Sequence, residues 1–175
     1  MNQAIARIHI RAISPCSSRG LVIAGNLRLP CALGRSGVRA RKREGDGATP
    51  KGAWRLVQGF WRADQLRRPR TALPFRRLTG QDGWCDDPCN RNYNRWVSLP
   101  YPASHERLWR DDRLYDLVVT LAHNTQPRQR FGGSAVFLHL ERPDRGPTAG
   151  CIALKLTDLR KLLAVCGPST WVVVW

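Results

Sequence analysis

Two short stretches, Val136-Phe-Leu-His-Leu140 and Thr148-Ala-Gly-Cys-Ile-Ala-Leu154, decide how this chain is interpreted. The first is an apolar run of β type that ends near a histidine, and eleven residues separate His139 from Cys151. A reactive thiol needs a base beside the sulfur and N–H groups directed at a developing oxyanion. A glycine directly before the cysteine removes a side chain where substrate and backbone approach each other. His139 and Cys151 are therefore the candidate base and nucleophile, with N–H groups near Gly150 and Cys151 for the oxyanion.

Each of these two residues also has a purely structural interpretation. A lone cysteine is most often a small buried core side chain, and a histidine at a strand end can be a hydrogen-bonded core residue. The structural interpretation suits Cys31 and Cys166 better than Cys151, because a turn over residues 147–150 delivers the Cys151 sulfur just before an expected helix. We therefore expect Cys151 and His139 to carry the chemistry.

The composition indicates one ordinary domain with a loop-rich β or α+β fold. The chain has 175 residues, of which 42% are hydrophobic, and it contains seven tryptophans. A chain of this size can bury a core without disulfides or metals, and its composition is not that of a disordered protein. Its 15 glycines and 12 prolines are scattered among short apolar runs, and no internal repeat is visible.

Alternation of apolar and polar residues predicts a series of strands. Residues 21–24 and 27–29 flank Gly25-Asn26, a dipeptide suited to a tight turn, and should form a hairpin. The other expected strands are 5–10, 31–34, 53–57, 115–122, 135–140 and a buried strand at 171–175.

Two helices and three irregular segments complete the expected organisation. Ser104 is predicted to cap a short helix that holds Leu108 and Trp109, and Thr157 to cap a second helix that ends before Gly167. The irregular segments are a turn-rich loop over 39–52, an Arg/Pro-rich connection over 62–80 and an aromatic loop over 84–96.

The formal charge of +16 is large for this length, and only four of the 29 basic residues are lysines. Such a surface attracts polyanions, which include nucleic acids, anionic glycans or peptides, and acidic lipid headgroups. A GC-rich genome is the alternative explanation for the arginine excess. No nucleic-acid motif is present and the arginines are spread along the chain, so a basic nucleic-acid-binding module is a remote alternative function.

The cysteines and the N-terminal segment exclude several further classes. Six cysteines lie at irregular spacings, and Cys85 and Cys89 form the one close pair, which is expected to be a local disulfide or two plain thiols rather than a zinc site. No run approaches the roughly 20 apolar residues of a membrane span. Met1 to Gly20 lacks the apolar core of about 7–15 residues that a signal peptide has.

At these residues the chain resembles the YkuD-type L,D-transpeptidases, which cross-link peptidoglycan with a cysteine nucleophile, and in particular the short stand-alone proteobacterial members. Thr148-Ala149-Gly150-Cys151 matches three of the four positions of the family's Ser/Thr-His-Gly-Cys ending. His139 stands in the place of the upstream histidine. The segment Asp46 to Trp54, with Thr49, Pro50 and Gly52, is similar to the Thr-Pro-x-Gly-x-Phe segment that lines the substrate groove.

The resemblance implies a single domain, mainly β with short helices, of the β-sandwich type found in the family. It divides the chain into residues 1–19, an N-terminal segment with the first strand, and residues 20–175, the catalytic domain. It implies no metal or organic cofactor, and stem peptides of peptidoglycan as partners. We expect no nucleic-acid partner, no membrane span and a monomer.

Three departures from the family pattern concern substrate recognition. Ala149 replaces a histidine, the loop before Cys151 is short, and Ala153 stands where the family often has arginine or asparagine. Arg142, Arg145 or Lys155 is a candidate replacement for that lost polar contact. His123-Asn124 either supplies the missing imidazole, orients His139, binds substrate, or forms a structural turn.

The implied reaction is a two-step acyl transfer through a cysteine thioester. Its product is a 3–3 or a 1–3 cross-link, and the nearest rival is hydrolysis of the same stem peptides by an L,D-carboxypeptidase or endopeptidase.

The expected location is the periplasm, although no signal peptide is recognisable. The basic run 39–43 suits stem-peptide carboxylates, and the loop 84–96 suits a lid. The candidate site residues are Cys151 and His139 for catalysis, and Gly150, Thr148, His123, Asn124, Arg142, Thr49, Pro50 and Gly52 for oxyanion or substrate contacts.

Overall fold

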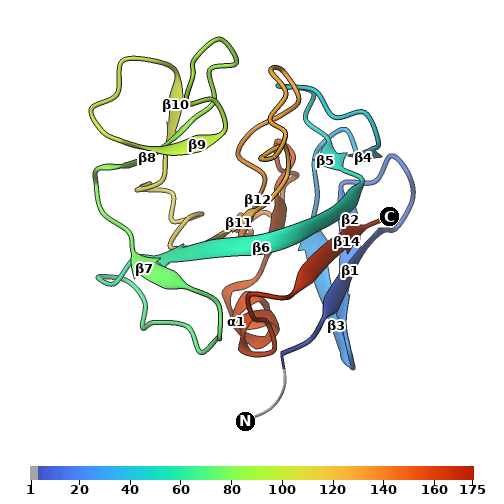
Figure 1. The fold of residues 1–175 in the computed structure, drawn as a ribbon. Coiled ribbons are helices and arrows are strands. Elements are labelled where there is room, and N and C mark those ends of the chain that lie inside the picture. The colour runs from blue at the N-terminus through green and yellow to red at the C-terminus, as the bar shows by residue number, and fades with distance from the viewer. Residues whose placement is uncertain (1–3) are drawn as a thin grey trace.

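The computed structural model describes residues 4–175, and its centre is one nine-stranded sheet that closes on itself (Figure 1). In chain order the strands of this sheet are β1 (Arg7–Ala12), β2 (Arg19–Ala24), β3 (Leu27–Ala32), β6 (Gly52–Trp61), β7 (Phe75–Arg77), β11 (Leu117–Leu121), β12 (Phe137–Leu140), β13 (Ile152–Leu154) and β14 (Trp171–Val174). Their spatial order is β11-β12-β13-β3-β2-β1-β14-β6-β7. Because β6 pairs with β14 through residues 52–55 and with β11 through residues 56–61, the pairings form a ring.

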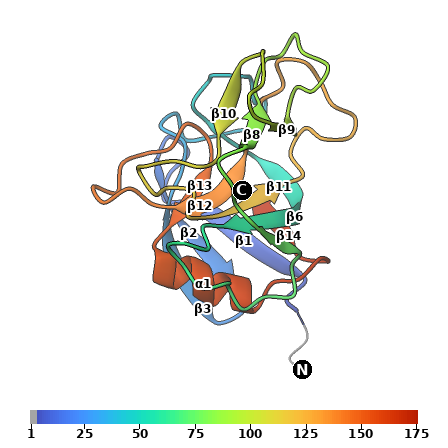
Figure 2. The ribbon, with the colours of Figure 1, turned by 90° about the vertical axis from the view of Figure 1, so that its left-hand side faces the viewer.

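The interior of this ring holds the main hydrophobic core. Strand side chains alternate between the two faces, so Ile8 and Ile10 of β1 and Val172 and Val174 of β14 point inward and are at most 2% exposed. Helix α1 (Leu156–Ala164) adds three buried leucines at positions 159, 162 and 163 to the same core. In both ribbon views the helix lies near the bottom of the molecule, beneath β6 (Figures 1 and 2).

A smaller three-stranded sheet stands above one side of the ring (Figures 1 and 2). It consists of β8 (Asp82–Cys85), β9 (Arg95–Ser98) and β10 (His105–Arg107), in the order β10-β8-β9. A second apolar cluster, separate from the main core, contains Phe60, Leu78, Leu108, Tyr115, Val118, Phe137 and Cys151. A two-stranded sheet of β4 (Val38–Arg39) and β5 (Thr49–Pro50) completes the fold.

The mainly β, single-domain architecture predicted from the sequence is confirmed. The predicted hairpin is formed by β2 and β3, and the strands expected at 53–57, 115–122 and 135–140 are present. The layers of the expected β-sandwich are parts of one closed sheet. The separate strand expected at 31–34 is wrong, because Cys31 and Ala32 continue β3 without a break.

Other local predictions were wrong where tertiary pairing overrides local preference. The helix expected after Ser104 is absent, because residues 105–107 pair with β8 as β10. The loop expected over 84–96 begins and ends in strands, with Trp84 opposite Trp96. The connection 62–80 contains β7, which pairs with β6.

The chain end and the helix start also differ from expectation. The C-terminal strand is not fully buried, since Trp171 is 39% exposed. Helix α1 has Lys155 rather than Thr157 at its N-cap, without a side-chain capping bond. Residues 1–3, the beginning of the segment inspected for a signal peptide, lie outside the described part of the chain.

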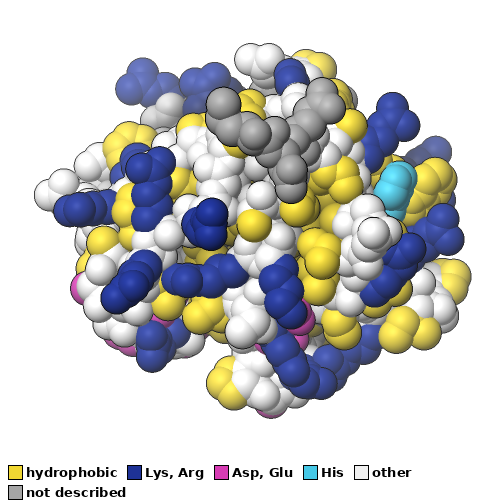
Figure 3. All heavy atoms as spheres, turned by 90° about the horizontal axis from the view of Figure 1, so that it is seen from below, with side chains coloured by type: hydrophobic (Ala, Val, Ile, Leu, Met, Phe, Trp, Pro, Cys, Tyr) yellow, Lys and Arg dark blue, Asp and Glu magenta, His cyan; other side chains and the backbone are white. Residues whose placement is uncertain are grey.

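Basic side chains are dispersed over one face of the molecule. On the face shown in Figure 3, Lys and Arg side chains extend across the whole view with apolar side chains between them, and Asp and Glu are few. Within residues 4–175, no helix has the length and apolar character required to cross a membrane.

Candidate active site

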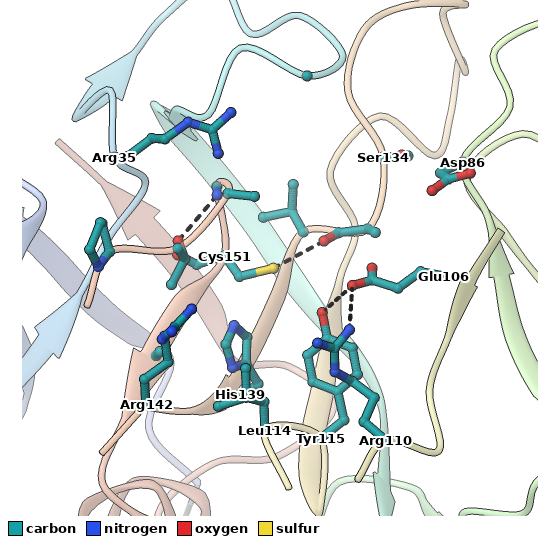
Figure 4. Close-up of a pocket in the computed structure, with 18 of the residues that line it drawn as sticks. Arg35, Asp86, Glu106, Arg110, Leu114, Tyr115, Ser134, His139, Arg142 and Cys151 are labelled. Atoms are coloured by element: carbon teal, nitrogen blue, oxygen red, sulfur yellow. Dashed lines mark hydrogen bonds and ion pairs between the residues drawn. The ribbon is translucent and has the colours of Figure 1, made fainter. Parts of the chain in front are cut away.

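Adjacent parallel strands bring His139 and Cys151 to one face of the closed sheet. In the register of β12 and β13, His139 lies opposite Ala153. Side chains alternate along a strand, so Cys151 projects to the same side as Ala153, which follows it by two residues. Cys151 therefore lies on the same face as His139. Both His139 and Cys151 line a pocket of about 580 Å³ on the outer face of the ring. Figure 4 shows the His139 ring and the Cys151 side chain next to each other in this pocket.

The Cys151 thiol is almost buried, with the residue 8% exposed. Its Sγ donates to the carbonyl oxygen of Ala135 at 3.1 Å and accepts from the N–H of Phe137 at 3.3 Å. Burial raises the pKa of Cys151 to about 12, and the negative charge of Glu106 acts in the same direction. The resting thiol is therefore protonated, and it becomes a nucleophile only when a base removes its proton.

His139 is a neutral imidazole that has an unprotonated nitrogen. Its Nδ1 lies 2.8 Å from the carbonyl oxygen of Leu140, which can only accept, so Nδ1 carries the proton and Nε2 does not. Burial lowers the pKa of His139 to about 4. The ring packs edge to face against Tyr115, with 5.2 Å between ring centroids. Within the described residues no hydrogen bond joins His139 to Cys151, so the S–H must turn away from Ala135 before Nε2 can accept its proton.

The turn before Cys151 requires its glycine. Gly150 has a φ of +144°, and a Cβ at this position would lie 2.8 Å from the carbonyl oxygen of Ala48. The Thr148 hydroxyl donates to the carbonyl oxygen of Cys151 at 2.6 Å and accepts from the Gly150 N–H at 3.1 Å. The Gly150 N–H is thus occupied, whereas the Cys151 N–H has no hydrogen-bond partner in the part of the chain described.

Charged side chains of both signs line the pocket. In Figure 4, Arg35 and Arg142 lie on one side of Cys151, and Asp86, Glu106 and the Arg110 that pairs with Glu106 lie on the other. Arg142 was one of three candidates to replace a lost polar contact. Of the three, Arg142 lines the pocket, whereas Arg145 and Lys155 line a different, smaller cavity of about 190 Å³.

Lys42 is a pocket residue that the sequence interpretation missed. It belongs to the basic run 39–43, yet its side chain is only 6% exposed, and its ammonium group forms an ion pair with Asp46. A Cβ on Gly150 would lie 3.6 Å from its Cε, so the Lys42 side chain packs beside the turn that carries Cys151. Its positive charge opposes the rise in the pKa of Cys151. The sequence signal that could have identified Lys42 is its spacing from Asp46, which lies four residues later in a glycine-rich turn.

His123 and Asn124 lie in a different pocket from Cys151. That pocket has a volume of about 440 Å³, and Lys42 is the residue that lines both pockets. His123 is held by the carbonyl oxygen of Gly132, 3.1 Å from Nε2, and burial lowers its pKa to about 4. The Asn124 amide donates to the carbonyl oxygens of Gln129 and Gly133, each at 2.9 Å. These contacts are those of a structural turn.

Thr49, Pro50 and Gly52 do not line the pocket that holds Cys151, and Pro50 lines the pocket of His123 and Asn124. Thr49 is fully buried, and its hydroxyl accepts from the N–H of Gly34 at 2.9 Å. Gly52 has a φ of +145°, and a Cβ there would lie 2.7 Å from the Trp54 ring. The neighbouring Ala48 is the residue of this segment whose backbone lies against Gly150, in the turn before Cys151.

The remaining cysteines are free thiols in the described residues. Cys85 is buried and Cys89 is exposed, and no disulfide joins them. No cluster of three or more His, Cys, Asp or Glu side chains within residues 4–175 is arranged to hold a metal ion.

Comparison with known proteins identifies the family. The model of the YkuD family, described as the L,D-transpeptidase catalytic domain, matches residues 20–174. A search of curated proteins finds no match. The matched span contains β12, β13, the turn before Cys151 and helix α1, and it covers nearly the whole chain. The chain therefore belongs to the YkuD family of L,D-transpeptidase catalytic domains.

Proposed function

We propose that this protein is a peptidoglycan L,D-transpeptidase that forms stem-peptide cross-links through a thioester on Cys151. The observation that carries the proposal is the meeting of a buried thiol and a neutral imidazole on adjacent strands in one pocket. Family membership supplies the substrate class, which is peptidoglycan peptides. Such a substrate lies outside the cytoplasm, so the proposed location is the periplasm, and the proposed acting species is a monomer.

Acylation begins from two neutral groups. Nε2 of His139 accepts the thiol proton while Sγ of Cys151 attacks the carbonyl carbon of a peptide bond adjoining an L-centre. The N–H of Cys151 donates to the developing oxyanion. The C–N bond then breaks, His139 returns the proton to the leaving amine, and the donor peptide remains as a thioester.

The second step transfers the donor peptide to an amine. A diaminopimelate amine of another stem attacks the thioester, a C–N bond forms, and the Cys151 thiol is released. The donor chosen decides between a 3–3 and a 1–3 cross-link. If water replaces the amine, the same thioester gives carboxypeptidase or endopeptidase activity, and this hydrolytic reaction is the alternative function.

Purified muropeptides distinguish these outcomes. We expect incubation with the protein to give cross-linked dimers, identified by mass spectrometry, and Cys151→Ala to abolish them. Cys31→Ala is the matched control, because Cys31 is also buried and burial also raises its pKa to about 12, but it lies in the main core. Shortened monomers without dimers would assign hydrolysis instead. Product formation that survives Cys151→Ala would refute the proposed nucleophile.

A further inference from the structure

Lys42 is a buried cation beside the turn that carries Cys151, and the proposed mechanism gives it no role. Its side chain passes between two glycines. A Cβ on Gly133 would lie 2.8 Å from the Lys42 Cγ, and a Cβ on Gly150 would lie 3.6 Å from the Lys42 Cε. Gly133 leads into residues 135–137, whose backbone contacts the Cys151 sulfur, and Gly150 directly precedes that cysteine. Lys42 therefore lies between the two chain segments that contact and carry the thiol.

The ammonium group of Lys42 is held in a fixed position. It donates to the carbonyl oxygen of Arg43 at 2.8 Å and forms an ion pair with Asp46. The Asp46 carboxylate accepts in turn from the N–H groups of Arg43 at 2.8 Å and Ala48 at 2.9 Å. Burial alone would raise the pKa of Asp46, but its bonds to Lys42 and to these N–H groups hold that pKa below its usual range. The glycine-rich turn thus fixes a charged pair beside the thiol.

Packing alone does not account for a lysine at this position. Removal of two charges from water is unfavourable, and well-packed apolar side chains of similar volume often stabilise a fold as well as a buried ion pair does. Methionine has a similar unbranched stem and no charge, so it could fill the space between Gly133 and Gly150. The presence of an ammonium group here therefore points to a use for the charge itself.

The first step of the proposed reaction needs positive charge near the sulfur. Cys151, whose pKa is about 12, must give its proton to His139, whose pKa is about 4, while the sulfur gains negative charge. Burial and the charge of Glu106 both raise the pKa of Cys151. Two further acidic side chains line the same pocket, Glu44 and Asp86. A fixed cation close to the sulfur would counteract these effects.

The other cations of the pocket are less suited to this task. Three of them are exposed, so that solvent screens their charge: Arg35, Arg107 and Arg142. Arg110 is already paired with carboxylates, and it adds to the effect of burial in lowering the pKa of His139. Lys42 is buried against the turn instead, and its charge opposes the rise in the pKa of Cys151.

We propose that Lys42 is a positioning residue for the reaction, and that its fixed ammonium group offsets the negative charge that develops on the Cys151 sulfur. This inference rests on the proposed function. During acylation the thiol proton passes to Nε2 of His139 and the S–C bond forms, while Lys42 keeps all three of its protons. When the C–S bond breaks in the second step, the same ammonium group stabilises the leaving sulfur until His139 returns a proton to it. Lys42 thus acts through the thiol and needs no contact with the substrate.

Alkylation of Cys151 by iodoacetamide tests this role without a stem peptide. The thiolate is the reacting form, so the rate at a fixed pH reports the charge near the sulfur, and peptide mapping separates Cys151 from the other free cysteines. We expect Lys42→Met to slow alkylation about tenfold at each pH from about 7 to 9, because fewer thiols are ionised. Lys42→Arg keeps the charge and should stay within about threefold of the unaltered protein. An unchanged rate in Lys42→Met, or an equal loss in Lys42→Arg, would overturn the proposal.

A second variant separates this role from a merely structural one. Lys42→Met and Asp46→Asn break the same ion pair, so a structural role would change the alkylation rate in the same direction in both variants. We expect opposite behaviour, because Asp46→Asn removes a negative charge and should leave alkylation as fast as in the unaltered protein or faster. A change in the same direction in both variants would overturn the proposal. Arg41→Met is the matched control, since Arg41 is exposed and lines the pocket of His123, and it should change the rate by no more than about twofold.

Thioester formation with a donor stem peptide provides the second measurement. We expect Lys42→Met to lower the maximal rate of thioester formation about tenfold, and to change the donor concentration that gives half of this rate by no more than about twofold. A change confined to that concentration would make Lys42 a substrate contact and would contradict the assignment. If the unaltered protein forms no thioester, the proposed function fails, and the alkylation experiment still decides whether Lys42 acts on the thiol.

Discussion

The two faces of β12 and β13 are both buried, but one faces the hydrophobic core and the other faces the pocket. Leu138, Ile152 and Leu154 face the interior of the ring and are fully buried in an aliphatic core. His139 and Cys151 face outward, are 5% and 8% exposed, and line a polar pocket. A shift of one residue in either strand would exchange the two sets. The inner face therefore fixes the register that places His139 and Cys151 in the pocket.

The largest effect is expected on the outer face. His139→Asn removes the proposed base, and we expect turnover to fall by about 10²–10⁴-fold, the usual contribution of a general base. Steady-state cross-linking of muropeptides measures this loss. The thermal midpoint should also fall somewhat, because the buried ring loses its contact with Tyr115, so turnover is compared per folded protein. Turnover near the original rate would show that His139 is not the base.

The matching substitution on the inner face is Leu138→Ala. We expect it to lower the free energy of unfolding by about 2–5 kcal/mol, because it opens a cavity beside fully buried neighbours. Urea denaturation measures the loss. The folded fraction should keep its turnover, because the side chain points away from the pocket. An inactive protein of unchanged stability would contradict the separation of the two faces.

The outer face should also make stability depend on pH. Burial lowers the pKa of His139 to about 4, while an unfolded histidine titrates near 6.5. The contribution of neutral, buried His139 to the free energy of unfolding is therefore complete above about pH 6.5. It is lost as the pH falls to about 4, by an amount on the order of 3 kcal/mol. His123 contributes in the same pH range.

Denaturation curves at a series of pH values measure this loss. The control is His139→Asn, in which the dependence should shrink to the part that His123 supplies. A stability that stays level from pH 7 to pH 4.5, or an identical pH dependence in the variant, would contradict neutral burial of His139.

The smallest effect is expected at the turn that joins the two faces. Gly150→Ala places a Cβ 2.8 Å from the Ala48 carbonyl oxygen at a positive φ, and we expect a loss of about 1–3 kcal/mol in the free energy of unfolding. Gly45→Ala is the matched control, because Gly45 also has a positive φ but open space around it. The difference between the two variants isolates the close approach to Ala48. Equal losses would show that no close approach is present.

Short-range patterns explain which parts of the fold could be predicted. The β2–β3 hairpin was predictable because its alternation and its Gly25-Asn26 turn are local properties. β10 was not, because His105-Glu-Arg107 becomes a strand only by pairing with β8. A three-residue segment without its partner has no periodicity to detect.

The same distinction applies to the pocket. His139 and Cys151 were identifiable because they lie on consecutive elements joined by one loop. Asp86 and Glu106 come from the small upper sheet, and Lys42 comes from a basic run that has the composition of a solvated loop. The positions of Asp86 and Glu106 depend on long-range packing, which leaves no pattern in a single sequence, whereas Lys42 could have been found from its spacing to Asp46.

The most direct test of the account is the mass of the protein during turnover. We predict that acid quenching with a donor stem peptide traps one thioester adduct, located by peptide mapping on Cys151 and absent from Cys151→Ala. Cys31→Ala should form the same adduct as the unaltered protein. An adduct on another residue, or cross-linking without any adduct on Cys151, would contradict the claim that the outer face of β12 and β13 carries the reaction.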